Sequence, residues 1–447
     1  MEQATGETPA ARRQRGEQLE LEIDSLAFGG RGVARSNGLV VFVAGALPGD
    51  RVRAEITKAK KRFAEARTVE LLRPGAERIA DRCVHDGEPC PGAPWQGLAY
   101  ERQLSQKSEQ VDEALRRIGD LDGFELEEIE PALEQWRYRN KLEYSFGERD
   151  GEPILGFHAR GRWDLIVDVD DCRLASERGN AARHAVLDWA RLEAVPPYDP
   201  RGREGVLRNL AVREGWRTGQ IQTRLVTSVA GFPKPPVDLH TAIEGDSGST
   251  DGPTGVLGEE RLREELCGLK LEMSHGAFFQ TNTEMAERLY GVAAEYAGLS
   301  GSERVFDLYC GIGTIGLTMA KKAGEVWGVE IVPEAIADAE RNAEQNKIEN
   351  ARFLAGSART GVRPLIEQAG KPDVVVIDPP RAGLSQKIVR RVIECDAKRI
   401  VYVSCNPTTL APNAAQLVEA GYRLTRVKPV DMFPQTPHIE CVALLEK

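Results

Sequence analysis

The last third of the chain alternates short apolar runs with stretches whose apolar positions recur every three to four residues. Continuous apolar runs are typical of strands buried on both faces, and their alternation with helical patterns favours a parallel sheet. A helix is expected to begin at Pro333, a residue suited to the first helical turn. The pattern predicts a doubly wound, Rossmann-like α/β sheet with strands at 304–308, 326–330, 352–355, 374–377, 400–404, 422–430 and 442–445.

A different period governs the chain from Glu17 to about Leu72. Leu19, Leu21 and Ile23 alternate with acids, and an Asn-Gly pair at 37–38 precedes an apolar run, as in a tight hairpin. Several short strands in a segment of about 55 residues predict a small OB-like β-barrel, which is a common platform for single-stranded nucleic acid.

The region between these two patterns mixes a polar helical stretch over 98–118 with strand signals near 139–146, 154–157, 165–169 and 220–226. Residues 231–258 are rich in Pro, Gly, Ser and Thr and are expected to have little order of their own. The chain is therefore predicted to divide into four parts: a disordered tail (1–16), the barrel (17–74), a mixed α+β central domain with a cysteine loop (75–270) and a C-terminal catalytic domain (271–447).

Composition narrows the class of protein. At 447 residues the chain exceeds one ordinary core, and no apolar run approaches the roughly 20 residues that cross a bilayer. Its start lacks the apolar segment of an export signal, and its eight cysteines are too irregularly spaced for a disulfide framework, so a cytoplasmic protein is expected. Nothing indicates an extended apolar interface, and a monomer is predicted.

Charge is distributed unevenly. The net charge of −10 argues against a uniformly basic surface, yet Arg51 to Leu72 carries seven basic residues against three acidic ones. This segment predicts either a nucleic-acid contact on the last hairpin of the barrel or a solvated charged face.

The run 311–316 has Gly-x-Gly-x-x-Gly spacing where a strand passes into a helix, as in nucleotide-binding loops. The match alone is weak, because the chain has 44 glycines. Glu330 ends the next strand, where a carboxylate can accept both hydroxyls of a ribose, and Asp307 and Tyr309 flank a pocket suited to a sulfonium cation. S-adenosylmethionine is therefore favoured over a nicotinamide dinucleotide, and an NAD-dependent oxidoreductase stays as the remote alternative.

The turn after the strand at 400–404 carries Cys405, and Glu440 precedes the final strand. Methylation at C5 of uracil needs a thiolate that adds to C6 and a base that removes the C5 proton. These two residues supply that pair. The structural alternatives are a buried strand-end thiol for Cys405 and a surface acid for Glu440. The Asp378-Pro-Pro-Arg381 loop lacks the terminal aromatic residue of enzymes that methylate exocyclic amines, which disfavours that reaction.

Taken together, the motifs resemble the class I RNA uracil-5-methyltransferases. Those that carry the resemblance are Gly276-Ala-Phe-Phe-Gln280, Asp307-Leu-Tyr-Cys-Gly311, Asp378-Pro-Pro-Arg-Ala-Gly383, Ser404-Cys-Asn-Pro407 and His438-Ile-Glu440. Upstream, Gly45-Ala-Leu-Pro-Gly-Asp50 is similar to the TRAM domain of that family, and Tyr138-Arg-Asn-Lys141 is similar to its central RNA-contacting region.

The resemblance implies a role for each matching residue. Gln280, Tyr309, Glu330 and Asp378 would contact S-adenosylmethionine. Cys405 would be the nucleophile, and Glu440 would take the C5 proton. The target uridine would have to leave its base stack to reach Cys405, which favours loops and bulges of RNA.

The ribosomal branch of this family often carries four cysteines that hold an iron–sulfur cluster, which suits four thiolates. Ala93 stands at the third loop position, so a complete cluster site is in doubt. An open iron, recruitment of His85 or Asp86, and loss of the metal all stay open. The matching thiols are those of Cys83, Cys90 and Cys172.

The TRAM domain and these cysteines favour 23S rRNA over the T-loop of tRNA as the substrate, by association only. A non-catalytic RNA-binding protein is the third interpretation, and it predicts that Cys405→Ala would leave function intact.

Overall fold

The computed structural model describes residues 14–85, 88–159, 161–229, 233, 239–244 and 250–447. Contacts group the chain into two compact units. Unit 1 comprises Met1–Val84, Ala93–Gln110 and Pro434–His438, and unit 2 comprises His85–Gly92, Val111–Phe433 and Ile439–Lys447. The predicted tail lies almost wholly outside the described residues.

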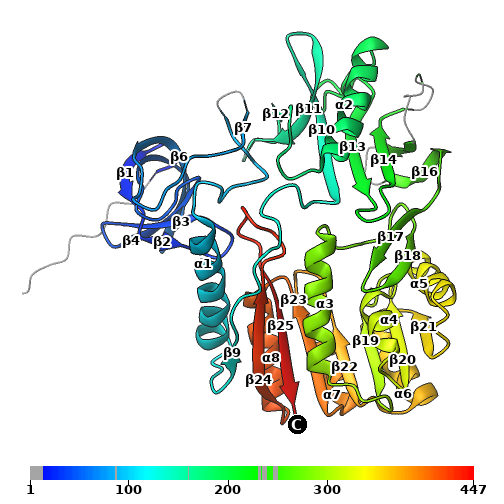
Figure 1. The fold of residues 1–447 in the computed structure, drawn as a ribbon. Helices are drawn as coiled ribbons and strands as arrows, with labels where there is room; N and C mark the ends of the chain where they lie inside the picture. Colours follow the sequence, from blue (N-terminus) through cyan, green and yellow to red (C-terminus); the bar gives the residue numbers. More distant parts are fainter. Residues whose placement is uncertain (1–13, 86–87, 160, 230–232, 234–238, 245–249) are drawn as a thin grey trace, which may run out of the picture. The chain divides into compact units, whose positions relative to one another are not determined.

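Unit 1 contains a six-stranded sheet in the order β1-β5-β6-β4-β3-β2, which curls so that β1 also contacts β3 (Figure 1). Its pairs are antiparallel except β4 with β6. Alternate residues of β5, namely Val52, Ala54 and Ile56, are fully buried, as period-two patterning requires. The strands are β1 (Gln18–Glu22), β2 (Ser25–Leu26), β3 (Gly32–Ser36), β4 (Leu39–Ala44), β5 (Arg51–Ala59) and β6 (Phe63–Arg73).

Four short or helical elements follow the barrel in the chain. They are the two-stranded pair β7 (Val84–His85) and β8 (Glu88–Pro89), the helix α1 (Tyr100–Glu113) and its π-helical continuation η1 (Ala114–Ile118). The helical stretch predicted over 98–118 is confirmed.

The first sheet of unit 2 has seven strands in the order β12-β11-β10-β13-β14-β15-β16, and α2 packs on one of its faces through a shared apolar core (Figure 1). Ser176 caps α2 by accepting a hydrogen bond from the Gly179 N–H. The elements are β10 (Lys141–Arg149), β11 (Glu152–His158), β12 (Ile166–Asp168), α2 (Glu177–Leu192), β13 (Leu207–Glu214), β14 (Ile221–Thr227), β15 (Leu239–Glu244) and β16 (Thr250–Leu257).

The second sheet of unit 2 has eight strands in the order β21-β20-β19-β22-β23-β25-β24-β9. The first five are parallel, and β25 runs antiparallel between β23 and β24. The strands are β9 (Glu125–Leu126), β19 (Arg304–Leu308), β20 (Glu325–Glu330), β21 (Ala351–Ala355), β22 (Val374–Ile377), β23 (Arg399–Ser404), β24 (Arg423–Val430) and β25 (Glu440–Glu446).

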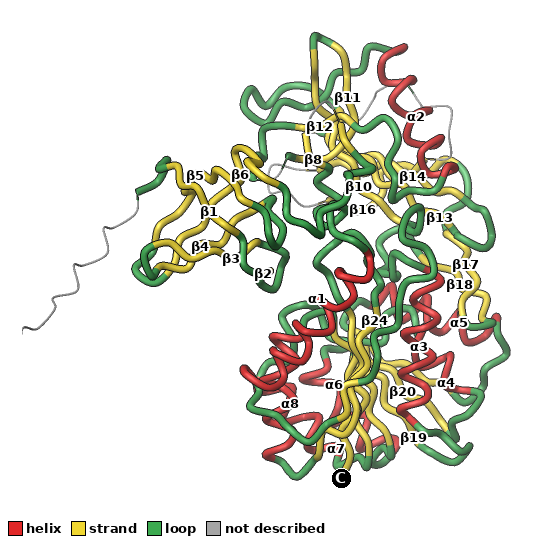
Figure 2. Tube along the Cα trace, turned by 60° about the vertical axis from the view of Figure 1, so that its left-hand side comes forward, coloured by secondary structure: helices red, strands yellow, loops and turns green. Residues whose placement is uncertain are grey.

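Helices cover both faces of this sheet, with α3 and α4 on one side and α7 and α8 on the other (Figure 2). The predicted doubly wound sheet is confirmed, and α5 begins at Pro333 as expected. A two-stranded hairpin, β17 with β18, precedes α3. These elements are β17 (Leu262–Leu266), β18 (Leu269–Met273), α3 (Thr283–Ala297), α4 (Thr314–Ala320), α5 (Pro333–Gln345), α6 (Ala358–Ala369), α7 (Gln386–Cys395) and α8 (Pro407–Glu419).

One expectation about order was wrong. The described parts of 231–258 form β15 and β16, because β14 offers a parallel edge to β15 and β15 pairs in turn with β16. Pairing with an existing sheet edge supplies hydrogen bonds that composition does not reveal. Residues 230–232, 234–238 and 245–249 lie outside the described part.

Candidate active site

The carboxyl end of β19 leads into a loop whose backbone is open to a ligand. Tyr309 is left-handed at φ 69°, and its N–H donates to the carbonyl of Val329 over 2.9 Å. Gly311, at φ 54°, has no atom within 4 Å of the place a Cβ would take. Gly313, at φ 86°, has no such room, since a Cβ there would come within 3.1 Å of Leu317. Glycine is therefore needed at 311 for close approach by a ligand and at 313 for packing.

Two carboxyl groups border this loop. Glu330 accepts hydrogen bonds from the N–H groups of Gly311 (3.3 Å) and Val332 (3.0 Å). Asp307 Oδ2 accepts from the Gly316 N–H over 2.8 Å, while its Oδ1 is buried without a partner among the described residues. Burial raises the pKa of Asp307 to about 7, against the effect of the Gly316 N–H. An unpartnered buried acceptor beside an open backbone fits a ligand that brings hydroxyl and cationic groups, as S-adenosylmethionine does.

Asp378 follows β22 at the same edge of the sheet. Its N–H donates to the Leu308 carbonyl over 3.3 Å, and burial, with Asp307 nearby, raises the pKa of its carboxyl to about 7. The structure thus brings Asp307, Tyr309, Glu330 and Asp378 together around the carboxyl ends of adjacent parallel strands, where open α/β sheets bind ligands.

Gln280 lies on a loop that the seven-stranded sheet holds in place. The Asn140 amide donates to the Gln280 carbonyl over 2.9 Å, and the buried Arg213 donates to the carbonyls of His275 (2.9 Å) and Ala277 (3.1 Å). Burial lowers the pKa of Arg213 to about 10. Arg213 is a functional candidate that was not predicted from the sequence. The signal that could have found it is an arginine beside the alternating apolar residues of β13.

Cys405, the predicted nucleophile, directly follows the last residue of β23 and is half-buried. Its turn is fixed on both sides. The Ser404 hydroxyl accepts from the Asn406 N–H over 3.1 Å, and the Asn406 side chain caps α8 by accepting from the Thr408 N–H over 3.1 Å. Cys405 therefore stands between a strand end and a capped helix start, at the edge where Asp378 lies.

Glu440 is the first residue of β25 and is only 4% exposed. Ser404 pairs with Cys441 at the end of the antiparallel register of β23 and β25, so Cys405 and Glu440 are the next residues on the two chains. The two groups lie close enough for Glu440 to contribute to the raised pKa of the Cys405 thiol.

The electrostatics of this pair favour protonation. Burial raises the pKa of Glu440 well above its ordinary value, with Asp378 adding to the rise and Arg381 opposing it. Burial, then Glu440 and Asp378, raise the pKa of Cys405 to about 12, again opposed by Arg381. Four groups therefore form one coupled cluster in which Arg381 is the cation.

The Asp378–Arg381 loop is tied directly to the Cys405 turn. The carbonyl of Arg381 accepts hydrogen bonds from the Asn406 amide (3.1 Å) and from the Thr409 hydroxyl (3.3 Å). Asn406 therefore caps α8 and holds the neighbouring loop with one side chain.

The predicted cluster ligands are buried thiols. Cys83, His85 and Cys90 offer ligand atoms that lie within 4.8 Å of one another, while Ala93 is 1% exposed and offers none. Burial raises the pKa of the Cys172 thiol, and the nearby Cys90 raises it further. Asp86, the other candidate substitute ligand, lies outside the described residues.

On the barrel, glutamates neutralise much of the basic segment. Arg51 and Arg53 pair with Glu20, and Lys58 and Arg67 pair with other acids of the sheet. Three cations of residues 51–72 form no ion pair within the described part of unit 1. They all lie in the β5–β6 turn: Lys60, Lys61 and Arg62. Fewer cations are therefore available to contact RNA phosphates than the sequence indicates.

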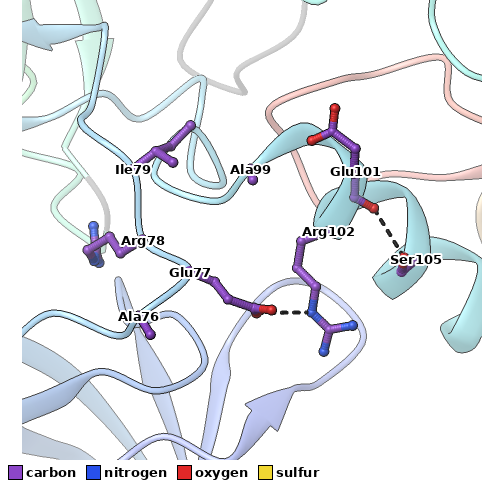
Figure 3. A pocket seen from close by; sticks show the side chains of 8 residues that line it. All are labelled: Ala76, Glu77, Arg78, Ile79, Ala99, Glu101, Arg102 and Ser105. Atoms are coloured by element: carbon purple, nitrogen blue, oxygen red, sulfur yellow. Dashed lines mark hydrogen bonds and ion pairs between the residues drawn. The ribbon is translucent and has the colours of Figure 1, made fainter.

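Unit 1 also has a pocket of about 450 Å³ (Figure 3). Within it the Arg102 guanidinium meets Glu77 at 3.4 Å, and Ser105 donates to the Glu101 carbonyl. The lining shares no residue with the predicted catalytic or cofactor set: it consists of Ala76, Glu77, Arg78, Ile79, Ala99, Glu101, Arg102 and Ser105. Among the described residues, every helix is too short or too polar to cross a membrane.

Comparison with known proteins gives consistent matches over the chain. The tRNA (uracil-5-)-methyltransferase family model matches residues 259–447, and the TRAM domain model matches residues 12–69. An RNA methyltransferase of Clostridium tetani is 37% identical over 97% of this chain and 98% of its own length. An RNA methyltransferase of Halalkalibacterium halodurans is also 37% identical, over 96% of each chain.

Among solved structures, the tRNA (uracil-54, C5)-methyltransferase of Pyrococcus abyssi in complex with S-adenosyl-L-homocysteine is similar to this chain with a TM-score of 0.77. The two share 28% identity over 96% of this chain and all of the other. The similarity therefore extends through both units and both sheets of unit 2.

Proposed function

The chain belongs to the S-adenosylmethionine-dependent RNA (uracil-5-)-methyltransferases, and from this we propose that it methylates C5 of a uridine in 23S rRNA through Cys405 and Glu440. The observation that supports the mechanism is the register of β23 and β25, which ends at Ser404 with Cys441 and so leaves Cys405 and Glu440 as the next residues on the two chains. The division of the chain into tail, barrel, central and catalytic domains at residues 16, 74 and 270 is part of the proposal, as is a cytoplasmic monomer.

In this mechanism the Cys405 thiolate adds to C6 of uracil and pushes the C5–C6 π electrons into an enolate. When bound, S-adenosylmethionine would supply the electrophilic methyl group that C5 receives, and S-adenosylhomocysteine would be the leaving group. The Glu440 carboxylate then removes the C5 proton, the electrons re-form the double bond, and the Cys405 thiolate leaves. Glu440 afterwards releases the proton to water, so the pair returns to its starting state.

Other residues position the reactants in this proposal. Gln280, Tyr309, Glu330 and Asp378 would hold the cofactor, with Glu330 at the ribose and the acids nearest its cationic centre. Arg381 would offset the negative charges of the Cys405–Glu440 pair, since it opposes the rise in pKa of both groups.

The choice of rRNA rests on the TRAM domain and on the three cysteines shared with the ribosomal branch of the family. The alternative substrate is the T-loop of tRNA, which one observation favours, since a solved structure that is similar over 96% of this chain is a tRNA (uracil-54, C5)-methyltransferase.

One experiment separates these possibilities. The protein is incubated with methyl-labelled S-adenosylmethionine and with rRNA or tRNA that lacks 5-methyluridine. We expect labelled 5-methyluridine in rRNA and none with Cys405→Ala. Glu440→Gln is expected to accumulate a methylated protein–RNA adduct that survives denaturation, since the C5 proton stays in place. Label in tRNA alone would replace the rRNA proposal, and undiminished label with Cys405→Ala would refute the mechanism.

We further propose that Cys83, Cys90 and Cys172 hold an iron–sulfur cluster with His85 as the fourth ligand. The support is the group of ligand atoms of Cys83, His85 and Cys90 and the lack of a donor at the buried Ala93. Cys172 is not part of that group, and its support is that the nearby Cys90 contributes to its raised pKa. The cluster would brace the surrounding segment and takes part in no step above. Iron and acid-labile sulfide are expected after anaerobic purification, and less of both in His85→Ala than in His158→Ala. Their absence from the unaltered protein would refute this assignment.

A further inference from the structure

We propose that Trp163 and Arg201 form a stacking platform for an unpaired base of the substrate RNA, next to but distinct from the target uridine. The inference rests on the proposed function only in that the substrate is RNA. Both residues lie in the seven-stranded part of unit 2, outside the segments that the two family models match.

Trp163 is unusually placed for a tryptophan. It lies in the loop between β11 and β12 and is 63% exposed, whereas the other five tryptophans are buried or half-buried. A large aromatic side chain left in water forgoes a sizeable hydrophobic gain, so its exposure favours a role in binding.

A second loop brings a cation to the indole. The guanidinium carbon of Arg201 lies 5.6 Å from the centroid of the Trp163 ring. Asp164 fixes this arrangement, since its carboxylate accepts from Arg201 over 2.7 Å and from Arg162 over 2.9 Å. One carboxylate thus serves two guanidinium groups, so the side chains of Arg162, Asp164 and Arg201 together keep a net positive charge, which the Asp199 carboxylate on the Arg201 loop offsets.

The loop that carries Arg201 is pre-formed. The Asp199 carboxylate accepts from the N–H groups of Arg201 (2.9 Å) and Gly202 (3.0 Å), and Asp199 also bridges to Glu204. At the base of the same loop, the Arg208 guanidinium lies 3.8 Å from the centre of the Tyr198 ring. Two arginine–aromatic pairs therefore flank one short segment.

This chemistry fits single-stranded RNA better than a protein surface. Bases stack on exposed aromatic rings and on guanidinium planes, and neighbouring cations contact phosphates. A protein partner would favour a wider apolar patch, whereas Trp163 is surrounded by charged groups.

The test uses the full-length protein, saturated with S-adenosylhomocysteine, and a fluorescein-labelled single-stranded oligouridine RNA. Trp163→Ala is expected to weaken binding roughly 5- to 150-fold, from about 1–3 kcal/mol of stacking per base at tenfold per 1.4 kcal/mol. Trp163→Phe should restore most of the affinity. The matched control is Leu192→Ala, which removes another exposed apolar side chain of the same unit and should leave binding unchanged.

Salt dependence and fluorescence separate stacking from charge. Arg201→Gln is expected to reduce the slope of log K against log salt by about one, whereas Trp163→Ala should leave that slope intact. RNA should quench tryptophan emission in the unaltered protein and much less in Trp163→Phe. In methylation assays Trp163→Ala should raise KM for RNA with little change in kcat.

An RNA affinity for Trp163→Ala within twofold of the unaltered protein would overturn the platform, and this is also the outcome expected if the loop docks a protein instead. Such a result leaves the proposed function standing when the unaltered protein still methylates RNA. Failure of the unaltered protein to bind or methylate any RNA would instead refute the proposed function.

Discussion

At the scale of single residues, the main tension is between burial and reactivity. The proposed reaction needs Cys405 as a thiolate and Glu440 as a carboxylate, but burial raises the pKa of both. A carboxylate with a raised pKa is the stronger base, which suits removal of a carbon-bound proton. A thiolate of high pKa is likewise the stronger nucleophile once formed. The cost is that only a small fraction of the free protein holds both ionised groups at neutral pH.

The pH dependence of methyl transfer follows from these directions. A group with a raised pKa is protonated at any pH below that pKa, so the fraction of the enzyme with Cys405 and Glu440 ionised grows as the pH rises. We therefore expect kcat/KM to rise from about pH 6 to about pH 9, by up to roughly tenfold per pH unit for one ionisation. Single-turnover methylation measures this profile. Arg381→Gln should move the rising limb to higher pH, because it removes the opposing cation. A profile that is flat over this range would contradict the account.

At the scale of elements, the position of the Cys405 thiol, the proposed nucleophile, depends on the start of α8. Asn406 caps that helix and also donates to the Arg381 carbonyl, so one side chain couples helix stability to the shape of the site. Ser357 caps α6 by accepting from the Thr360 N–H and has no such second role in the site.

These two caps give a matched comparison. Asn406→Ala and Ser357→Ala should each cost about 1 kcal/mol of stability. Only Asn406→Ala should lower kcat/KM, by roughly 10- to 100-fold, because the loop that carries Arg381 is released. Asn406→Ser keeps a cap without the amide donor and should separate the effects, with near-normal stability and reduced activity. Denaturant unfolding and methylation assays measure both, and equal activity in the two alanine variants would refute the coupling.

Sequence patterns predict the elements whose cause is local. The apolar runs 326–330 and 374–377 correspond closely to β20 and β22, since a strand buried on both faces shows its burial directly in its composition. The two-residue strand β9 could not be predicted, because its pairing is supplied by Arg426 and Val427, about 300 residues away.

The same limit applies to the site. Sequence motifs indicate that Cys405 and Glu440 are candidate catalytic residues, but their proximity comes from the insertion of β25 between β23 and β24, which no spacing reveals. Arg213 escapes sequence analysis for a related reason, because its partners are backbone carbonyls of a distant loop. Exposure of Trp163 is likewise a property of the folded surface.

At the scale of the whole molecule, the apolar core of the barrel in unit 1 is separate from the two apolar clusters of unit 2. The residues proposed to hold the cofactor and the Cys405–Glu440 pair all belong to unit 2. Ligand binding stabilises the structure that binds it, and a domain with its own core can unfold as its own cooperative unit.

Calorimetry should therefore resolve two unfolding transitions. S-adenosylhomocysteine at a hundredfold excess over its Kd adds about 2.7 kcal/mol to the stability of the unit that binds it. The transition of unit 2 is expected to rise by several degrees while that of unit 1 stays in place. Variants that destabilise the barrel core, such as Ile56→Ala, identify the transition of unit 1. A single transition that moves as a whole would show that the units unfold together.

The place of β25 in the sheet has a consequence for biosynthesis. Among the eight strands of that sheet it is made last, yet it lies in the interior, between two strands synthesised earlier. While the ribosome is still adding these residues, β23 and β24 each present an unpaired edge, and Glu440 is not yet beside Cys405. In the proposed mechanism, the emerging polypeptide therefore lacks the base that removes the C5 proton until the last strand enters the gap.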